Sequence, residues 1–519
     1  MIELERAFEQ TYKILFGECN QKMEDLHDYL LKYQYNLPAY MQTKKTKKQI
    51  TICSPNYPKE ANFISYNEID FAKNYEPVNI NKIKDIDSLI EQFGERFDYA
   101  GNKVFGNSQH IENSDNCTDS YFVQNSHNIE SSKYIAYSAY VRSGSEYIFG
   151  CSHMITGKYK IKFVGGDKCT RCFETFLSTN CSDIYFSMYC QGCIETMFSF
   201  NCRSKRYCIG NQQIEKDKYL GIKKQLLVQM REYLEKHKKF YSIFDYPPPT
   251  KESLIAHHVP KIVQTEGNMK PIEDTFRATT KLILGKELTP IDKYEKYLSV
   301  RLDKINKTTS VFGNEIYYSN YFLNRNVPKQ RLVSDKEAEY ASNFKIDLKE
   351  GDKLEEIMRK LEPIVYFPAQ FREGSDVNNI MCPYVYHASD GYKVCDNTLS
   401  KKVGYCIHPH SCEAMFGSGV LVKDCKYCIR CHNSTKLTAC MDCDSCSNCS
   451  FSMFCHNCEN LENCMFCFNV KSKRYAIGNV EYPKEEYLKM KEKICKEIVL
   501  RLEKDGDIGF DIYNLGVKK

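Results

Sequence analysis

Residues 425–470 read CKYCIRCHNSTKLTACMDCDSCSNCSFSMFCHNCENLENCMFCFNV, and every third residue of this stretch follows one pattern. The positions that carry the pattern are uncharged and mostly small: Cys425, Cys428, Cys431, Ser434, Leu437, Cys440, Cys443, Cys446, Cys449, Ser452, Cys455, Cys458, Leu461, Cys464, Cys467 and Val470. The residues between them are mostly polar or charged. Because an α-helix repeats at about 3.6 residues and a strand at about 2, a period of three fits neither element.

A period of three predicts a very narrow β-solenoid. In such a coil each short segment sends one side chain inward before the chain turns a corner, so that roughly twelve residues complete one turn. Stacked turns then bury a thin core, which has no room for a large side chain at every inward position. We therefore expect residues 425–470 to belong to a Cys-rich β-solenoid.

The cysteines of this stretch allow three interpretations. Paired thiolates at CxxC spacing suit zinc or an iron-sulfur cluster, and disulfides are another alternative. However, Leu437, Leu461 and Val470 occupy the same register, and their side chains cannot ligate a metal. We favour free thiols that act as small buried hydrophobic residues.

A second period-three stretch begins at Phe105. Serines recur every six residues with larger residues midway between them: Ser108, Ser114, Ser120, Ser126, Ser132 and Ser138, alternating with Ile111, Cys117, Val123, Ile129, Ile135, Val141 and Tyr147. After a predicted break over residues 152–168, the pattern resumes in a new phase over residues 169–202. Alternating small and large residues fill a thin core without voids, so we expect a first β-solenoid here.

The two stretches look like an internal duplication. FSMYCQGC at 186–193 matches FSMFCHNC at 451–458, and FNCRSKRYCIGN at 200–211 matches FNVKSKRYAIGN at 468–479. Each copy leads into an amphipathic pattern that predicts a helix, one over 216–239 and one that begins after Pro483. In the first helix we expect Leu220, Leu227, Met230 and Leu234 to share one buried face.

Two sets of outward residues near the solenoid exits are candidates for partner binding. Phe186 and Phe198, like Phe454 and Phe466, are twelve residues apart and should stack as apolar ladders. The following helix would cover each ladder, or a partner protein would. The duplicated basic turns, Lys205 with Arg206 and Lys473 with Arg474, would contact nucleic acid or lie in solvent.

One group of metal-ligand residue types falls outside the period-three pattern as we interpret it. It comprises Cys382, Cys395, Cys406, His408, His410 and Cys412. Packing explains the other cysteines but not this group, which is therefore the best zinc candidate in the sequence. We otherwise expect no cofactor.

The chain as a whole is predicted to be α+β, with two narrow β-solenoids, each followed by a helix. We place an N-terminal helical and extended segment at 1–104, the first solenoid with its helix at 105–245, a mixed region at 246–375, and the second solenoid with its helix at 376–519. In the mixed region we expect helices near 272–285, 289–306 and 350–362.

Composition bounds the compartment and the partners. The formal net charge is +5 over 519 residues, so charge does not demand a polyanion partner. The 27 cysteines are an odd number, and we see neither a signal-peptide pattern in residues 1–30 nor an apolar run long enough for a membrane span. These features favour a reducing, cytoplasmic compartment without membrane contact.

The Cys-rich tract, the SKRYCIGN and SKRYAIGN turns at 204–211 and 472–479, and the KEEY helix start at 484–487 resemble a known group. These are uncharacterised Cys-rich proteins of candidate-phyla bacteria and some archaea, often mislabelled as CaiB/BaiF-type CoA-transferases. The likeness covers roughly residues 85–235 and 400–500, and it implies a solenoid fold but no activity. This chain lacks the group's amino-terminal CxxC knuckle, and nothing in it reads as the βαβ unit that a CoA-transferase would require.

The sequence favours a non-enzymatic structural or scaffolding protein, a subunit of a larger assembly. It contains no nucleophile elbow, P-loop or GxGxxG motif, and no small-molecule substrate is evident. Protein partners or self-association are expected. The alternatives are a metal-binding (zinc or iron-sulfur) or thiol-redox protein, and a nucleic-acid-associated protein.

Overall fold

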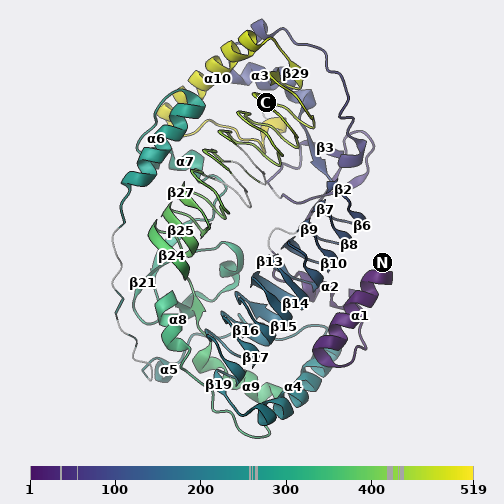
Figure 1. Cartoon of the computed structure of the whole chain (residues 1–519), viewed down its shortest axis with the longest axis vertical. Coiled ribbons are helices and arrows are strands. Elements are labelled where there is room, and N and C mark those ends of the chain that lie inside the picture. Colours follow the sequence, from purple (N-terminus) through teal and green to yellow (C-terminus); the bar gives the residue numbers. More distant parts are fainter. Residues whose placement is uncertain are drawn as a thin grey trace.

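The chain folds as a mixed α/β structure around a long sheet of fifteen short, largely parallel strands (Figure 1). This computed structural model describes residues 2–34, 38–54, 56–255, 259, 261–262, 267–417, 425–430, 432 and 438–517. Cys431, Ser434 and Leu437, which belong to the period-three pattern, lie outside the described residues. No helix in the described ranges is long and apolar enough to cross a membrane.

The fifteen-stranded sheet covers residues 104–213, which we call the first tract. Its strands are β5 (Val104–Phe105), β6 (Gln109–Glu112), β7 (Asp115–Thr118), β8 (Tyr121–Gln124), β9 (His127–Glu130), β10 (Lys133–Ala136), β11 (Ala139–Val141), β12 (Glu146–Phe149), β13 (Ser152–Met154), β14 (Gly157–Gly166), β15 (Cys169–Phe176), β16 (Ser182–Met188), β17 (Ile194–Met197), β18 (Arg206–Ile209) and β19 (Gln212–Gln213). From β14 to β18, neighbouring strands pair in parallel at a spacing of twelve residues: Lys160 with Cys172, Cys172 with Ile184, Ile184 with Thr196 and Thr196 with Cys208.

The second tract, residues 371–481, repeats this arrangement with fewer regular strands. It begins with β24 (Phe371–Ile380), β25 (Tyr384–Tyr392), β26 (Asp396–Thr398) and β27 (Lys401–Gly404). Isolated parallel bridges at mostly twelve-residue spacing then continue from Thr398 with His410 to Met465 with Ile477. The antiparallel pair β28 (Ala476–Ile477) and β29 (Val480–Glu481) ends the tract, as β18 and β19 end the first.

A left-handed backbone residue at every third position produces the period of three. Asn116, Asp119 and Phe122 have φ angles of 57°, 47° and 56°, and each directly precedes an inward residue. Left-handed φ is least costly for glycine and asparagine and most costly for β-branched residues. Accordingly, no Val, Ile or Thr among the described residues has a positive φ.

The inward Ser, Thr and Cys side chains hydrogen-bond to the backbone of their own tract. The Ser126 hydroxyl donates to Gln124 O at 2.7 Å and accepts from Ser138 N at 3.0 Å. The Cys181 thiol donates to Thr179 O and accepts from Cys193 N at 3.4 Å. Because the thiol and the hydroxyl make the same contacts, the two residue types can exchange in one register.

The predicted break over residues 152–168 is wrong, because β13 and β14 continue the sheet through it. One extra residue causes the change of phase instead: β11 pairs with β13 at a spacing of thirteen, Ala139 with Ser152. Tyr147, predicted to point inward, therefore lies half-buried outside the core, and Ile148 takes the inward position.

The helices lie mostly along the outer side of the two tracts (Figure 1). They are α1 (Ile2–Phe16), α2 (His27–Leu31), α3 (Ile86–Phe93), α4 (Lys216–His237), α5 (Lys251–Ile255), α6 (Lys270–Leu284), α7 (Glu295–Leu298), α8 (Asp335–Ala341), α9 (Leu354–Lys360) and α10 (Lys484–Asp505). The predicted helices near 272–285 and 350–362 correspond to α6 and α9. The helix expected over 289–306 is only a 3-10 turn, Ile291–Tyr294, followed by α7.

Both long exit helices form, but the predicted face of α4 is partly wrong. Its buried residues are Tyr219, Leu226, Met230 and Leu234, whereas Leu220 is 41% exposed. Leu227 is half-buried, and the Tyr219 ring lies 5.6 Å from that of Tyr207. The domain boundaries stay a prediction.

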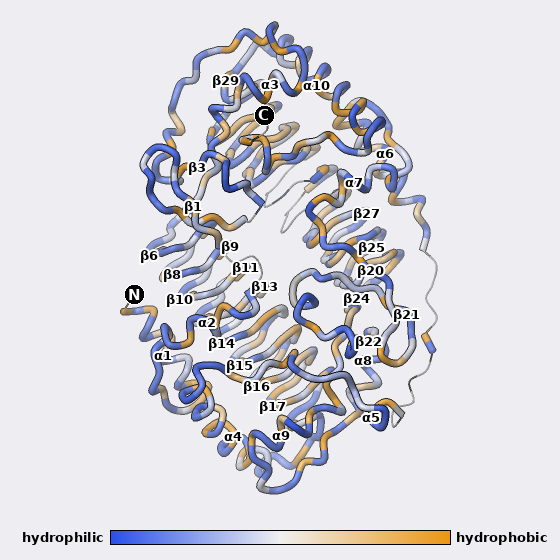
Figure 2. Tube along the Cα trace, turned by 180° about the vertical axis from the view of Figure 1, so that it is seen from behind, coloured by the Kyte–Doolittle hydropathy of each residue, from blue (hydrophilic) through white to orange (hydrophobic). Residues whose placement is uncertain are grey.

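The two tracts run side by side and meet near both ends (Figures 1 and 2). At one end, Asn201 Nδ2 of the first tract donates to Tyr366 O at 3.1 Å, just before the second tract begins. Near the middle, Ala139 and Tyr140 pack with Tyr321, Cys395 and Ile407. At the other end, the start of the first tract meets the end of the second. Short strands from the N-terminal segment, β1 (Ala39–Gln42), β2 (Gln49–Ile52), β3 (Asn62–Ser65) and β4 (Asp98–Gly101), also lie there (Figure 1).

Candidate functional site

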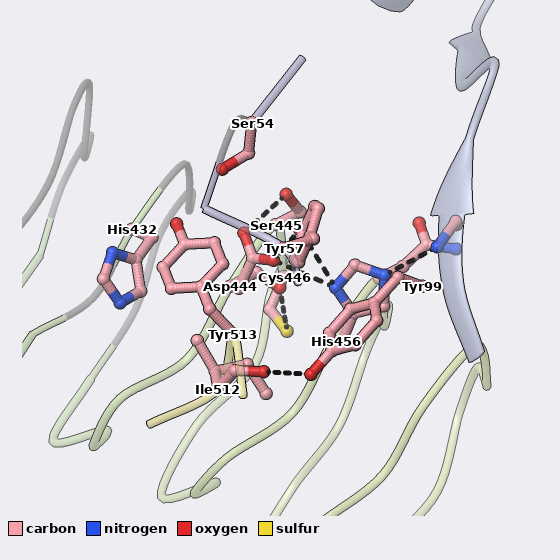
Figure 3. Close-up of polar contacts among 12 residues, drawn as sticks. Ser54, Tyr57, Tyr99, His432, Asp444, Ser445, Cys446, His456, Ile512 and Tyr513 are labelled. Carbon is pink, nitrogen blue, oxygen red and sulfur yellow. Dashed lines mark hydrogen bonds and ion pairs between the residues drawn. The ribbon is translucent and has the colours of Figure 1, made fainter. Parts of the chain in front are cut away.

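Buried polar side chains from distant parts of the chain gather where the first tract begins and the second ends, a region we call the junction (Figure 3). Asp444 Oδ2 accepts hydrogen bonds from the Tyr57 hydroxyl and from His456 Nδ1, the latter at 2.9 Å. Ser445 Oγ donates to Asp444 Oδ1 at 2.9 Å. The Tyr57 ring packs against Tyr99 at 4.5 Å between centroids.

The surroundings of His456 fix its protonation state. The Ala100 N–H donates to His456 Nε2 at 2.9 Å, so Nε2 carries no proton and Nδ1 donates to Asp444. Burial lowers the pKa of His456, although the hydrogen bond to Asp444 opposes this. Burial would raise the pKa of Asp444, but the contacts with His456 hold it well below its ordinary value. The pair is therefore a neutral imidazole on a carboxylate.

A buried ion pair lies in the same region at the start of the first tract. Lys103 Nζ and Asp115 Oδ2 are 2.8 Å apart, and both side chains are fully buried. Asp115 also accepts from Cys53 N at 2.8 Å. Burial would lower the pKa of Lys103, but Asp115 raises it above its ordinary value. Asp115 of β7 thus holds both Lys103, which precedes β5, and Cys53, which lies between β2 and β3.

The C-terminal segment is held in the junction by a second set of charges. Asp511 accepts from Arg301 Nε at 2.7 Å and from Arg430 Nη2 at 3.1 Å. Asp442 accepts from Ile512 N at 3.1 Å and lies 3.6 Å from Arg430. These contacts join the second tract, the region before it and the end of the chain.

A cavity of about 490 Å³ lies next to Asp444, and residues of both tracts line it. We call it the junction cavity. Its lining includes Tyr66, Phe71, Phe105, Asn116, Asn128, Glu130 and Arg142 from the N-terminal half of the chain, and Ser445, Ser447, Asn457, Glu459 and Lys471 from the second tract. Arg142 Nε lies 3.8 Å from Glu130 Oε2, and Lys471 Nζ lies 2.8 Å from Glu459 Oε2.

The interpretation that the predicted zinc cluster lies outside the inward register is wrong for three of its residues. Cys382, Cys406 and Cys412 are buried in the core of the second tract with Val385 and Val403. Their phase differs from that of residues 425–470 because one residue is inserted between Glu413 and Lys426, which bridge at a spacing of thirteen.

The other three residues of that cluster lie outside the core of the second tract. Cys395 packs with Tyr321 and Ile407, His408 Nδ1 contacts Asp396 at 2.6 Å, and the His408 and His410 rings are 6.3 Å apart. Within the described ranges no group of three or more His, Cys, Asp or Glu has the geometry of a metal site. Zinc binding stays a prediction.

The predicted partner-binding phenylalanines lie in the interior of the chain. Phe186, Phe198, Phe454 and Phe466 are all fully buried. Phe240, just after α4, packs on Phe186 at 5.7 Å between ring centroids, and Phe510 packs on Phe454 at 5.0 Å. The chain itself covers both ladders, so a partner could reach them only if these covers moved.

The basic turns lie at the surface, as the sequence predicts. Arg206 and Arg474 are exposed, and Lys205 and Lys473 are half-buried. Arg474 pairs with Glu462, one repeat earlier. Contact of these turns with nucleic acid stays a prediction.

The junction residues were missed from the sequence, although many leave a signal there. Opposite charges or hydrogen-bonding partners recur at a spacing of twelve: Lys103 with Asp115, Glu130 with Arg142, Arg171 with Asp183, Arg430 with Asp442, Asp444 with His456 and Glu459 with Lys471. Twelve residues is one repeat, which places each pair side by side on neighbouring strands or bridges.

Comparison of the chain with protein-family models, with curated proteins and with solved structures finds no match. The resemblance to the Cys-rich group therefore stays a prediction.

Proposed function

We propose that this chain is a non-enzymatic structural protein in which two narrow β-solenoids, with coils of about twelve residues, form a rigid frame within a larger assembly. The observation that carries the proposal is the parallel pairing at a twelve-residue spacing in both tracts. The inward Ser, Thr and Cys side chains support a structural role, because their polar groups are used in hydrogen bonds to the backbone of their own tract.

The junction also favours structure over chemistry. Tyr57, Asp444 and His456 have the residue types of a catalytic relay, but a general base needs a ring nitrogen within reach of substrate. Both ring nitrogens of His456 are occupied by Asp444 and by the Ala100 N–H, and the side chain is fully buried. The arrangement supports a role in fixing the two tracts to each other.

A half-exposed aromatic column on the first tract is the surface that we assign to the assembly. It consists of stacked rings one repeat apart: His110, Phe122, Tyr134, Tyr147 and Tyr159. Centroid distances between neighbours run from 4.6 to 5.2 Å. Partly exposed aromatic rings are enriched at protein interfaces, where they supply a rigid contact area.

The test uses tagged full-length chain recovered from its own cells under mild conditions and sized by chromatography. We expect wild-type protein to elute above its mass of 60.6 kDa, and the double variant Phe122→Lys, Tyr134→Lys to elute as a folded monomer. Tyr121→Lys is the matched control, since Tyr121 neighbours the column without belonging to it. Elution of the wild type as a monomer would reject the assembly role.

A further inference from the structure

The junction cavity contains a guanidinium group with unused donors. Arg142 Nε approaches Glu130 Oε2 only to 3.8 Å, and the guanidinium donates no hydrogen bond to any residue in the described part of the chain. Its side chain is 17% exposed, so water reaches little of it. A desolvated guanidinium presents a planar set of N–H donors, which fits the two oxygens of a carboxylate.

Two asparagine side chains lining the same cavity use their amide N–H groups within the chain. Asn116 Nδ2 donates to Asn128 Oδ1, and Asn457 Nδ2 donates to Asn469 Oδ1 at 2.8 Å. Each amide thus donates along its own tract through Nδ2, and both side chains line the cavity, where Oδ1 is the remaining acceptor of each amide. Glu459 adds a carboxylate. These acceptors suit an ammonium group, which has three donors and no acceptor.

One part of the cavity wall is aromatic. The Tyr66 ring lies edge-on to Phe105 at 5.1 Å and to Phe71 at 5.7 Å between centroids. Lys471 Nζ lies 4.6 Å from the Phe71 ring centre. Such a wall takes the apolar part of a ligand, and a volume of about 490 Å³ is that of a small-molecule site.

Among the described residues that line the cavity the charges balance, with Arg142 and Lys471 against Glu130 and Glu459. A balanced lining favours a ligand of no net charge that carries both signs over a bare anion, because complementary potentials select the partner. We propose that the junction cavity binds a free α-amino acid with an aromatic or large apolar side chain. Arg142 holds its carboxylate, Asn116, Asn457 and Glu459 hold its ammonium group, and the Tyr66 wall holds its side chain.

Isothermal titration calorimetry on the full chain tests the ligand class. The probes are L-phenylalanine, phenylpropionate without the ammonium group, phenethylamine without the carboxylate, L-alanine without the ring, and inorganic phosphate. We expect L-phenylalanine to bind and each other probe to bind on the order of tenfold more weakly or less, because each leaves part of the site unpaired. Phosphate binding as tight as that of L-phenylalanine, or no heat from L-phenylalanine at millimolar concentration, overturns the proposal.

Variants test the location. Arg142→Gln should abolish binding of L-phenylalanine, whereas Arg171→Gln, which removes a pair with Asp183 that is not part of the cavity lining, should leave it unchanged. Ser447→Trp fills the cavity from an exposed position and should also block binding without touching the buried groups. Binding that survives in folded Ser447→Trp protein places the ligand elsewhere and rejects this site, even if Arg142→Gln fails to fold.

Discussion

Asp444 and His456 lie one twelve-residue repeat apart, and their side chains meet through a hydrogen bond of 2.9 Å between Oδ2 and Nδ1. The same carboxylate accepts from Tyr57, which belongs to the N-terminal segment. One buried pair on the second tract therefore anchors a segment that leads into the first tract. The twelve-residue repeat of the second tract therefore also determines where the N-terminal segment packs, because Tyr57 is held by a pair that the repeat brings together.

Removing the carboxylate of Asp444 should cost much more stability than removing an exposed one in the same register. Asp444→Ala removes the buried acceptor that the Tyr57 hydroxyl and the His456 N–H share and leaves them only their 3.4 Å contact with each other. We expect a loss of about 3–5 kcal/mol. Glu462→Ala is the matched control: it removes the Arg474 pair, whose side chains are 42% and 64% exposed, and should cost about 1 kcal/mol or less. Urea unfolding midpoints measure both. Equal midpoints for the two variants would contradict the anchoring role.

The junction should weaken as pH falls below about 6.5, the ordinary pKa of histidine. Burial lowers the pKa of His456, so between that value and its lowered folded value the unfolded chain binds a proton that the folded chain does not. The contribution of His456 is thus fully present above pH 6.5 and is lost as pH falls through this window. The lowered pKa of Asp444 acts in the same direction at still lower pH.

The measurement is the melting temperature from pH 7.5 to 5. His456→Gln should flatten the decline relative to wild type, because glutamine does not titrate. His27→Gln, which changes a half-exposed imidazole on α2, should leave the slope unchanged. A His456→Gln curve parallel to that of the wild type would mean that another group carries the pH dependence.

Periodicity alone identified the inward residues, because burial in a thin core demands small or apolar side chains at fixed intervals. Leu461 and Val470 are buried as expected. The period-three pattern gives wrong inward positions wherever one residue is inserted, as between Ala139 and Ser152. A single insertion shifts the phase of every later position. The zinc cluster was singled out for this reason: Cys382 and Cys406 belong to the inward register on the other side of an insertion.

The junction was hidden for a different reason. Asp444 and His456 carry the twelve-residue spacing signal, which marks polar pairs as well as the phenylalanine ladders. Tyr57 and Ala100 carry none, because they come from segments without a repeat, and only the closure of the chain brings them to the second tract. Contacts between residues this far apart in sequence leave no local pattern in a single sequence.

Thiol labelling should distinguish packing from chemistry. None of the 26 described cysteines forms a disulfide within the described residues, and each is buried except Cys19, which is half-exposed. We expect a thiol reagent to modify the native protein slowly and mainly at Cys19, and to reach all 27 cysteines of the sequence in denaturant. Cys19→Ser is the control and should remove the early phase. Rapid native labelling of many thiols would contradict a packed interior.

Leu461 tests the inward register directly. Leu461→Asp places a charge in the thin core of the second tract, where the side chain is 1% exposed, and should cost several kcal/mol or unfold the tract. Leu500→Asp is the control, since Leu500 is 66% exposed on α10. Leu437, the equivalent choice from the sequence, lies outside the described residues. Circular dichroism melts that agree for Leu461→Asp and wild type would show that the register is wrong.

The cover of the first phenylalanine ladder can be opened from α4. Met230 is fully buried in the core that contains Phe186 and Phe198, so Met230→Glu should force either a buried charge or a displaced helix. A displaced helix exposes an apolar face, and we expect aggregation on size-exclusion chromatography. Val228→Glu, on the same helix but 38% exposed, should stay monomeric or keep its wild-type assembly. A Met230→Glu protein that melts and elutes like Val228→Glu would show that α4 does not protect the ladder, and the ladder would again be open to a partner.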